Sequence, residues 1–259
     1  MYKLTRPDGF DFYSGTVNYR EAIGTIIRVT DYDGPEVGAC GRGLHASRNP
    51  NDCFIGARIP CAAFRVQGIQ RIAGDMEKSR YQALKVIEEI TDLDGLFGWN
   101  YSEVINPINP FKIQPPEITK SHIESLKRWA SVRASVGASV GASVWASVWA
   151  SVRASVWASV GDSVWDSVGD SVRASVGASV RASVWASVRD SVRASVWAYV
   201  GFLFPNIKKW KHVDSAVVGY PFQAVVDLWR QGLVPSFDDK IWRIHGGENA
   251  ETLWQGKLD

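Results

Sequence analysis

The chain has 259 residues, a formal net charge of +2 and 46% hydrophobic residues. This length allows one large or two to three small domains, and so small a charge excludes a strongly acidic DNA mimic and gives no strong overall attraction to polyanions. The cysteine count of 3 is odd and no signal-like N-terminus is present, which favours a reduced, cytoplasmic protein. The longest wholly apolar stretches are too short to span a bilayer, so we expect no membrane partner.

Residues 1–116 have a mixed composition and are expected to form an α+β N-terminal domain. Short strand-like runs such as residues 62–66 alternate with polar turns, and residues 77–91 have the apolar spacing of a helix. The expected buried face of that helix consists of Ala83, Leu84, Ile87 and Ile90. No Walker loop, dinucleotide fingerprint or metalloprotease helix is present in the sequence, so we expect no cofactor.

The sharpest local feature of this domain is the segment Gly43-Leu44-His45-Ala46-Ser47. A histidine close to a serine suggests a base or a substrate-gripping pair, which makes His45 and Ser47 the candidate catalytic residues. We favour the alternative of a buried histidine in a glycine-flanked turn, because no partnered nucleophile or acid is identifiable. The set Cys40, His45, Cys53 and Cys61 has no CxxC or HxxxH spacing, so no metal site is predicted.

Three segments of the domain resemble the N-terminal domain of uncharacterised phage and prophage proteins, in which low-complexity tandem repeats often follow. They are the GLHAS segment, residues 5–9 (TRPDG) and residues 75–78 (DMEK). Residues 232–246 also resemble a tail found in such proteins. The resemblance implies a phage-encoded protein in the host cell cytoplasm, and it carries no activity. His45 is distantly similar to the nucleotide-binding strand of ADP-ribosyltransferases, which implies an enzyme in residues 1–116 as an alternative.

Residues 117–129 are expected to form a capping helix that runs directly into a repeat. Residues 121–124 have capping-box spacing, and the apolar residues fall near one face. These residues are Ile118, Ile123, Leu126 and Trp129. We expect this helix to cover the first end of the repeat.

Residues 130–201, called the repeat below, consist of the four-residue unit Ala/Asp-Ser-Val-X, with valine at every fourth position from Val132 to Val200. The X position holds six tryptophans, six arginines and six glycines. These three residue types interchange through the first base of one codon. The pattern indicates tolerated drift at X and a requirement for serine and valine.

A four-residue period predicts an extended chain rather than a helix. An α-helix advances about 100° per residue, so each repeat unit drifts by roughly 40° and sweeps valine around the helix. In an extended chain valine points one way while serine and X point the other, which resembles the pentapeptide-repeat proteins with a unit one residue shorter. We therefore expect a central tetrapeptide-repeat β-solenoid with valine inside and Ala or Asp at or near a corner.

The X position suggests a binding surface as a further alternative. Four units per coil would stack Arg133, Trp149, Trp165, Arg181 and Trp197 in one column. Interleaved arginine and tryptophan are typical of surfaces that bind single-stranded nucleic acid. We favour codon drift and expect nucleic-acid binding to be weak or absent, because a selected face would not accept six glycines.

Residues 202–259 are expected to form a small α+β C-terminal cap, with a helix over 221–230 and strands over 241–244 and 252–254. Taken together, the sequence favours a non-enzymatic, phage-type interaction or structural protein that uses the repeat as a scaffold or binding surface. Its partner is expected to be a protein, such as a host factor that it inhibits. The sequence specifies neither the partner's identity nor the oligomeric state.

Overall fold

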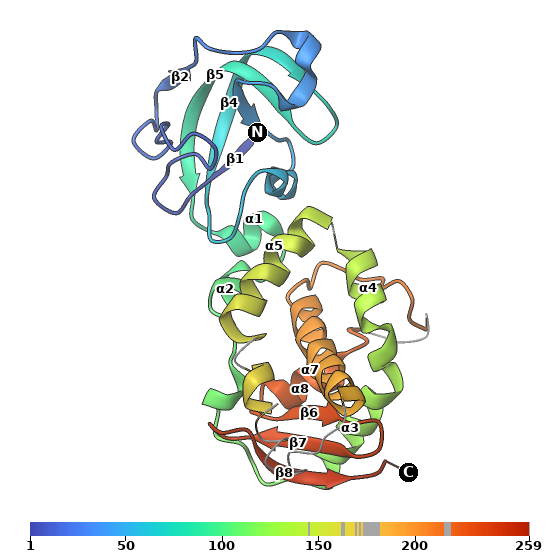
Figure 1. Cartoon of the computed structure of the whole chain (residues 1–259). Helices are drawn as coiled ribbons and strands as arrows, with labels where there is room; N and C mark the ends of the chain where they lie inside the picture. The colour runs from blue at the N-terminus through green and yellow to red at the C-terminus, as the bar shows by residue number, and fades with distance from the viewer. Residues whose placement is uncertain are drawn as a thin grey trace. The chain divides into compact units, whose positions relative to one another are not determined.

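The computed structural model describes residues 1–144, 146–161, 164–168, 170, 172, 182–214 and 219–258. They form two compact units, Met1–Ser102 and Glu103–Asp259, and each unit has its own antiparallel sheet (Figure 1). The fold is α+β. Within the described residues, no helix is both long and apolar enough to cross a membrane.

The first unit is built on a five-stranded sheet. Its strands are β1 (Tyr2–Thr5), β2 (Ile26–Arg28), β3 (Leu44–Ala46), β4 (Ala62–Gly74) and β5 (Ser79–Ile90). The β4–β5 hairpin forms the centre, β1 pairs with β4, and both β2 and β3 pair with β5. Short helical elements complete the unit, namely η1 (Pro35–Cys40), η2 (Pro50–Ile55) and α1 (Leu93–Phe97). The strand expected at residues 62–66 is confirmed as the start of β4.

Strand β5 occupies most of residues 77–91, so the helix expected there is wrong. Leu84 and Val86 are both buried at the spacing of two that one face of a strand requires, whereas Ile87 is 43% exposed. β5 pairs with β4 from Ser79 to Ile90. This long-range pairing outweighs the local apolar spacing that indicated a helix, because strand formation depends on the neighbours that a segment meets.

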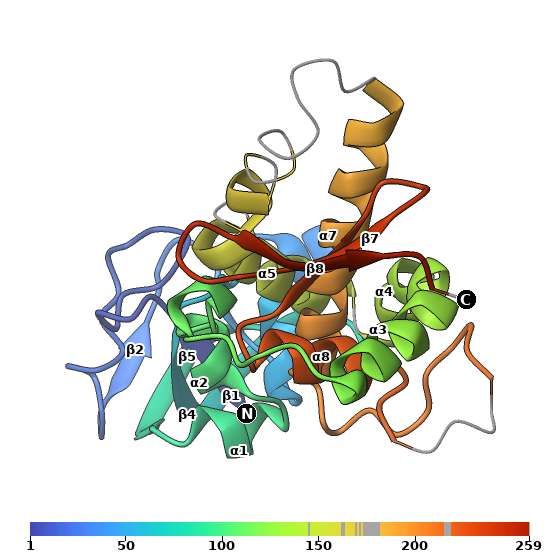
Figure 2. The same ribbon diagram turned by 90° about the horizontal axis from the view of Figure 1, so that it is seen from below.

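The second unit consists of helices packed against a three-stranded sheet. The helical elements are α2 (Tyr101–Ile105), which begins in the first unit, η3 (Pro110–Lys112), α3 (Lys120–Val132), η4 (Arg133–Ser135), α4 (Val136–Ser143), α5 (Ala146–Val156), η5 (Trp157–Gly161), α7 (Ala182–Phe202) and α8 (Gln223–Trp229). The sheet has the order β6 (Val234–Phe237), β7 (Trp242–Gly246) and β8 (Glu251–Gly256). Helix α7 contacts α4, α5, α8 and β6, and in the view of Figure 2 strand β8 crosses in front of α7.

Several expected elements of this unit are confirmed. The capping helix appears as α3, although its N-cap is Thr119 with His122 as the reciprocal partner, not Ser121 with Glu124. The helix expected over 221–230 appears as α8, and both expected strands of the C-terminal cap appear as β7 and β8.

The repeat is helical, so the expected β-solenoid is wrong. No strand occurs among its described residues, and the structure accommodates the four-residue period in two ways. First, the helix is interrupted, by a 3₁₀ turn in η4, by extended backbone at Val144 (φ −97°, ψ 144°) and by the wider π turn of η5. Each interruption lets the next helix begin at a new rotation. Second, α7 contacts neighbours on several sides, so a valine that drifts around this helix still meets a partner.

The expected burial of the repeat valines is confirmed for most of those that the structure describes, although Val132, the first of them, is only half-buried. From Val136 to Val172 and from Val188 to Val200, each described repeat valine is at most 6% exposed. The aspartates that replace alanine at positions 166, 170 and 190 are exposed. Valine therefore forms the core of the helical repeat, and aspartate is accepted where the chain faces solvent.

Two buried serines of the repeat bond to the preceding helical turn, whereas the buried Ser139 hydroxyl has no hydrogen-bond partner within the described residues. Ser191 Oγ donates to the Val188 carbonyl over 2.8 Å, and Ser195 Oγ donates to the Ser191 carbonyl over 3.2 Å. Both residues are buried in α7. At these two positions the hydroxyl has a hydrogen-bond partner in its own helix. The small serine side chain can therefore be buried there without leaving a polar group unpaired.

Candidate functional site

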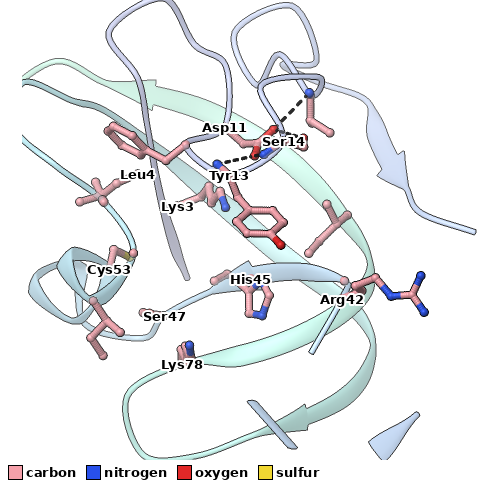
Figure 3. Close-up of a pocket in the computed structure, with 18 of the residues that line it drawn as sticks. Lys3, Leu4, Asp11, Tyr13, Ser14, Arg42, His45, Ser47, Cys53 and Lys78 are labelled. Atoms are coloured by element: carbon pink, nitrogen blue, oxygen red, sulfur yellow. Dashed lines mark hydrogen bonds between the residues drawn. The ribbon is translucent and has the colours of Figure 1, made fainter. Parts of the chain in front are cut away.

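A cavity of about 580 Å³ lies in the first unit. It is lined by β1, by the loop of residues 11–19, by residues 40–47 with β3, and by η2 with the turn before β5. Small-molecule pockets in proteins have volumes of roughly 300–1,000 Å³, so this cavity has the size of a ligand site. Figure 3 shows Lys3, Tyr13, His45 and Lys78 arranged around the same space.

Lys3 extends from β1 into the wall of this cavity. Its Nζ lies 5.4 Å from the centroid of the Tyr19 ring, a cation–π distance. Burial lowers the pKa of Lys3, and the charge of Asp11 opposes that shift only in part. Within the described residues, no carboxylate oxygen lies within 4.0 Å of this nitrogen. A partly desolvated ammonium without an ion pair is energetically unfavourable.

Asp11 is near Lys3, but its carboxylate is occupied by its own loop. It accepts hydrogen bonds from Tyr13 N over 2.9 Å, from Ser14 N over 2.7 Å, from Ser14 Oγ over 2.6 Å and from Val17 N over 3.3 Å. Burial alone would raise the pKa of Asp11, but these hydrogen bonds outweigh burial and lower it. The loop is therefore fixed, and it presents the Tyr13 side chain, which is 99% exposed, at the mouth of the cavity (Figure 3).

His45 lies on β3 and is held by a backbone carbonyl. Its Nε2 is 3.0 Å from the Ala39 carbonyl oxygen, which can only accept, so Nε2 carries the proton and Nδ1 is an acceptor. Burial and then the charges of Lys3 and Lys78 lower the pKa of His45 to about 4. The imidazole is therefore neutral at pH 7.

Ser47 is buried directly after β3. Its backbone exchanges hydrogen bonds of 2.8 and 3.0 Å with Tyr2, and its side chain interacts with the thiol of Cys53. Among the described residues, no hydrogen bond joins Ser47 to His45. The structure thus brings both candidate catalytic residues to one cavity without forming a base–nucleophile pair.

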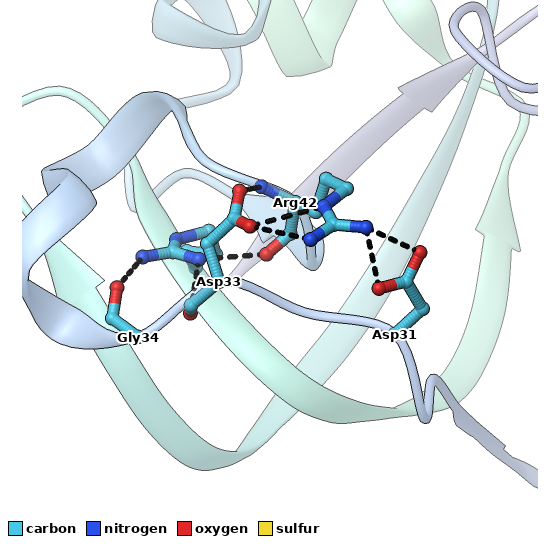
Figure 4. Close-up of polar contacts among 5 residues, drawn as sticks. Asp31, Asp33, Gly34 and Arg42 are labelled. Atoms are coloured by element: carbon cyan, nitrogen blue, oxygen red, sulfur yellow. Dashed lines mark hydrogen bonds and ion pairs between the residues drawn. The ribbon is translucent and has the colours of Figure 1, made fainter.

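A polar network closes another side of the cavity (Figure 4). Arg42 donates to both oxygens of Asp31 over 2.6 and 2.7 Å and pairs with Asp33 over 2.8 Å, so its charge is neutralised. The buried Arg80 guanidinium holds the same loop through four backbone carbonyls. These belong to Asp33, Gly34, Gly38 and Arg42. Of the lysines and arginines that line the cavity, Lys3 and Lys78 therefore have no ion pair within the described residues.

The part of the cavity near η2 is less positive. Asp52 lines it there, and burial followed by the charges of Glu77 and Asp75 raises the pKa of its carboxyl. The lining is therefore not uniformly positive, because Lys3 and Lys78 share it with Asp52. An anionic ligand is therefore expected to place its negative charge beside Lys3 and Lys78 and away from Asp52.

The cysteines do not show the features of a reactive or metal-bound thiol. Burial raises the pKa of Cys53, and it raises the pKa of Cys61 to about 12. Cys40 is exposed. In the part of the chain that the structure describes, no group of three or more His, Cys, Asp or Glu residues is arranged as a metal site.

The five X residues expected to stack in a nucleic-acid-binding column are distributed over several elements. Arg133 lies 5.0 Å from the Phe237 ring centroid and 5.4 Å from that of Trp242. The Trp165 ring is 5.9 Å from the Arg189 guanidinium, and the Trp197 ring is 4.9 Å from that of Arg193. Arg181 and the side chain of Trp149 lie outside the described residues. The described members thus contact residues of the second unit, and the column was expected on the basis of a β-solenoid, which the described residues do not form.

Sequence reasoning identified His45 and Ser47 but missed Lys3, Tyr13 and Lys78. Lys3 and Tyr13 lie near the start of the chain and Lys78 far along it, and no local motif links them. Comparison of the chain with protein-family models, with curated proteins and with solved structures found no match.

Proposed function

We propose that this chain is a non-enzymatic binding protein whose first unit captures a small anionic molecule in the cavity beside Lys3. The proposal depends on one observation: the Lys3 ammonium lines the cavity, is partly withdrawn from water and has no ion pair within the described residues. A cation in this position destabilises the protein unless an anion binds it, and binding an anion would remove that penalty. Lys78, in the turn before β5, adds a second cation to the lining of the same cavity.

His45 supports binding in preference to catalysis. A histidine whose pKa is about 4 is a weak base at neutral pH, and its Nε2 proton is already donated to Ala39. Its Nδ1 is left as an acceptor that suits a hydroxyl or another donor of the ligand. No observation favours the ADP-ribosyltransferase alternative over binding.

The second unit supplies a helical scaffold in this proposal. Its valine core gives a packed body in which Arg189 lies over Trp165 and Arg193 over Trp197. A protein partner, a phage origin and a location in the host cytoplasm are supported only by the resemblance of the GLHAS segment to phage and prophage proteins. They are retained as parts of the proposal on that basis.

Isothermal titration calorimetry of the full chain with inorganic phosphate in chloride buffer tests the proposal. We expect saturable binding that weakens about tenfold or more in Lys3→Met, since a charge-assisted hydrogen bond contributes roughly 1.5–3 kcal/mol. Lys85→Met is the matched control, because Lys85 is exposed on β5 and does not line the cavity. Absence of saturable binding, or equal binding by the two variants, contradicts the proposal.

A further inference from the structure

A second pocket, of about 360 Å³, adjoins the cavity at the turn between β4 and β5. Its lining includes Arg48, Arg71 and Lys78. Lys78 also lines the main cavity, so one lysine connects the two spaces. Ser47 also lines the main cavity, and Arg48 is the next residue in the chain.

The basic residues of this second pocket are available to a ligand. Arg71 donates from Nε to Ser79 Oγ over 3.3 Å, which leaves the terminal nitrogens of its guanidinium for other acceptors. Within the described residues, Arg48, Arg71 and Lys78 form no ion pair within 4.0 Å. Lys3 therefore lines the cavity, Arg48 and Arg71 line the second pocket, and Lys78 lines both.

Two acids also line this pocket, and they differ in their engagement. The Asp75 carboxylate accepts from Glu77 N over 2.9 Å and from Lys78 N over 2.8 Å, and these bonds lower its pKa and close the turn. Glu77 is exposed. Asp75 is thus a structural part of the turn, whereas Glu77 opposes an anion in the pocket only through its charge.

We infer that the anion bound beside Lys3 carries at least one further linked anionic group that reaches Arg71 and Arg48 through Lys78, as a condensed phosphate does. This inference rests on the proposed function of the cavity. Linked phosphates place negative charges at short intervals, and the lysines and arginines that line the two pockets offer several cations to pair with them. An arginine guanidinium can donate two parallel hydrogen bonds to the oxygens of one phosphate group. A ligand with a single carboxylate beside Lys3 would leave Arg71 and Arg48 without such a partner.

The experiment compares orthophosphate, pyrophosphate and tripolyphosphate by calorimetry on the full chain. We expect tripolyphosphate to bind at least about tenfold more tightly than orthophosphate, a difference of roughly 1.4 kcal/mol. Arg71→Ala should remove most of that gain and leave orthophosphate affinity unchanged. Glu77→Gln should increase tripolyphosphate affinity, because it removes a repulsive charge and keeps the size of the side chain. Arg65→Ala, on β4 but outside both pockets, is the control.

The outcomes separate this inference from the proposed function. Equal affinities for the three phosphates, or equal weakening of all three by Arg71→Ala, overturn the inference and leave the Lys3 site intact. Failure of all three to bind overturns both. Adenosine triphosphate distinguishes a free polyphosphate from a nucleotide: a nucleotide ligand should bind more tightly than tripolyphosphate and lose that advantage in Tyr13→Ser, whose ring stands at the mouth of the cavity.

Discussion

The indole ring of Trp197 occupies the space beside Gly137 in which any side chain at residue 137 would stand. Both residues hold the X position of the repeat, one in α4 and the other in α7. The Arg193 guanidinium lies over the same indole at 4.9 Å from its centroid. Gly137 leaves space for the Trp197 ring, and the Arg193 side chain packs on that ring. Here one glycine, one tryptophan and one arginine of the X position therefore pack against each other.

The first prediction concerns the glycines of α4. Gly137→Ala should destabilise the protein by about 1–3 kcal/mol, because the new methyl group meets the Trp197 ring. Gly141→Ala, at the next X position of the same helix, has no atom within 4 Å of its new methyl group. It should stabilise by about 0.5–1 kcal/mol through helix propensity. Urea denaturation of both variants measures the difference.

A double variant gives the control for this pair. Trp197→Ala removes the obstacle, so Gly137→Ala should cost little or nothing in that background. The same loss of stability from Gly137→Ala in both backgrounds would show that Trp197 is not the cause. Equal effects of the two glycine substitutions would mean that the X position varies freely.

The second prediction contrasts adjacent residues of one repeat unit. Val164→Asp should reduce stability by on the order of 3 kcal/mol or more, because it buries an unpaired carboxylate where Val164 is fully buried. Trp165→Gly should cost about 1–2 kcal/mol, from helix propensity and the lost contact with Arg189. Thermal melts test the ranking, and similar losses from both changes would show that Trp165 belongs to the core.

The sequence predicted the burial of the repeat valines correctly and their secondary structure incorrectly. The drift argument holds for a straight, isolated helix that buries one face. It does not hold for α4 and α5, which are interrupted before the drift accumulates, or for α7, which is covered on several sides. The periodicity of a sequence indicates which residues are buried. Whether the segment buries them as a helix or as a strand depends on the elements that pack around it.

The candidate site could be predicted only in part for a related reason. The GLHAS segment marked His45 because glycine, histidine and serine form a recognisable local pattern. Lys3 is an ordinary residue in the sequence, and its importance comes from the Tyr19 ring beside it and from the occupation of Asp11 by its own loop. Such a property arises only when distant segments pack together.

The third prediction concerns two histidines. Burial is the largest cause that lowers the pKa of His45 and of His245, in each case to about 4. The ordinary value is 6.5, so between these two values the unfolded chain binds more protons than the folded protein. The stability that is present above pH 6.5 should therefore fall as the pH decreases through that window towards 4.

Proton NMR of the imidazole resonances measures these pKa values directly. At pH 5.5 the signals of His45 and His245 should still have the chemical shifts of neutral rings, with His45→Asn used to assign one of them. A pKa near 6.5 for His45 would mean that its ring is hydrated and that the cavity wall is open to water.

The fourth prediction concerns the Tyr19 hydroxyl, which is buried and has no hydrogen-bond partner within the described residues. A buried hydroxyl left unpaired costs roughly 1–3 kcal/mol, so Tyr19→Phe should stabilise the unliganded protein by about 1 kcal/mol. The aromatic ring beneath Lys3 is retained in this variant. Chemical denaturation checks the sign, and a loss of stability would reveal a partner for the hydroxyl, such as a bound water.

The last prediction uses Lys3 to separate a structural role from a binding role. Burial lowers its pKa, so Lys3 holds its proton less tightly in the folded protein than in the unfolded chain, and at neutral pH its charge favours unfolding. Lys3→Met keeps the apolar stem and removes the charge, while Asp11 keeps the hydrogen bonds of its loop. Without phosphate, the variant should melt at a higher temperature than the parent protein, and the melting temperature of Lys85→Met should not change.

Added phosphate should raise the melting temperature of the parent and of Lys85→Met but not that of Lys3→Met. A residue kept for folding would give the opposite result, because its removal would lower the melting temperature with or without the anion. A gain in stability coupled to a loss of binding is expected only where a cation is retained for a ligand.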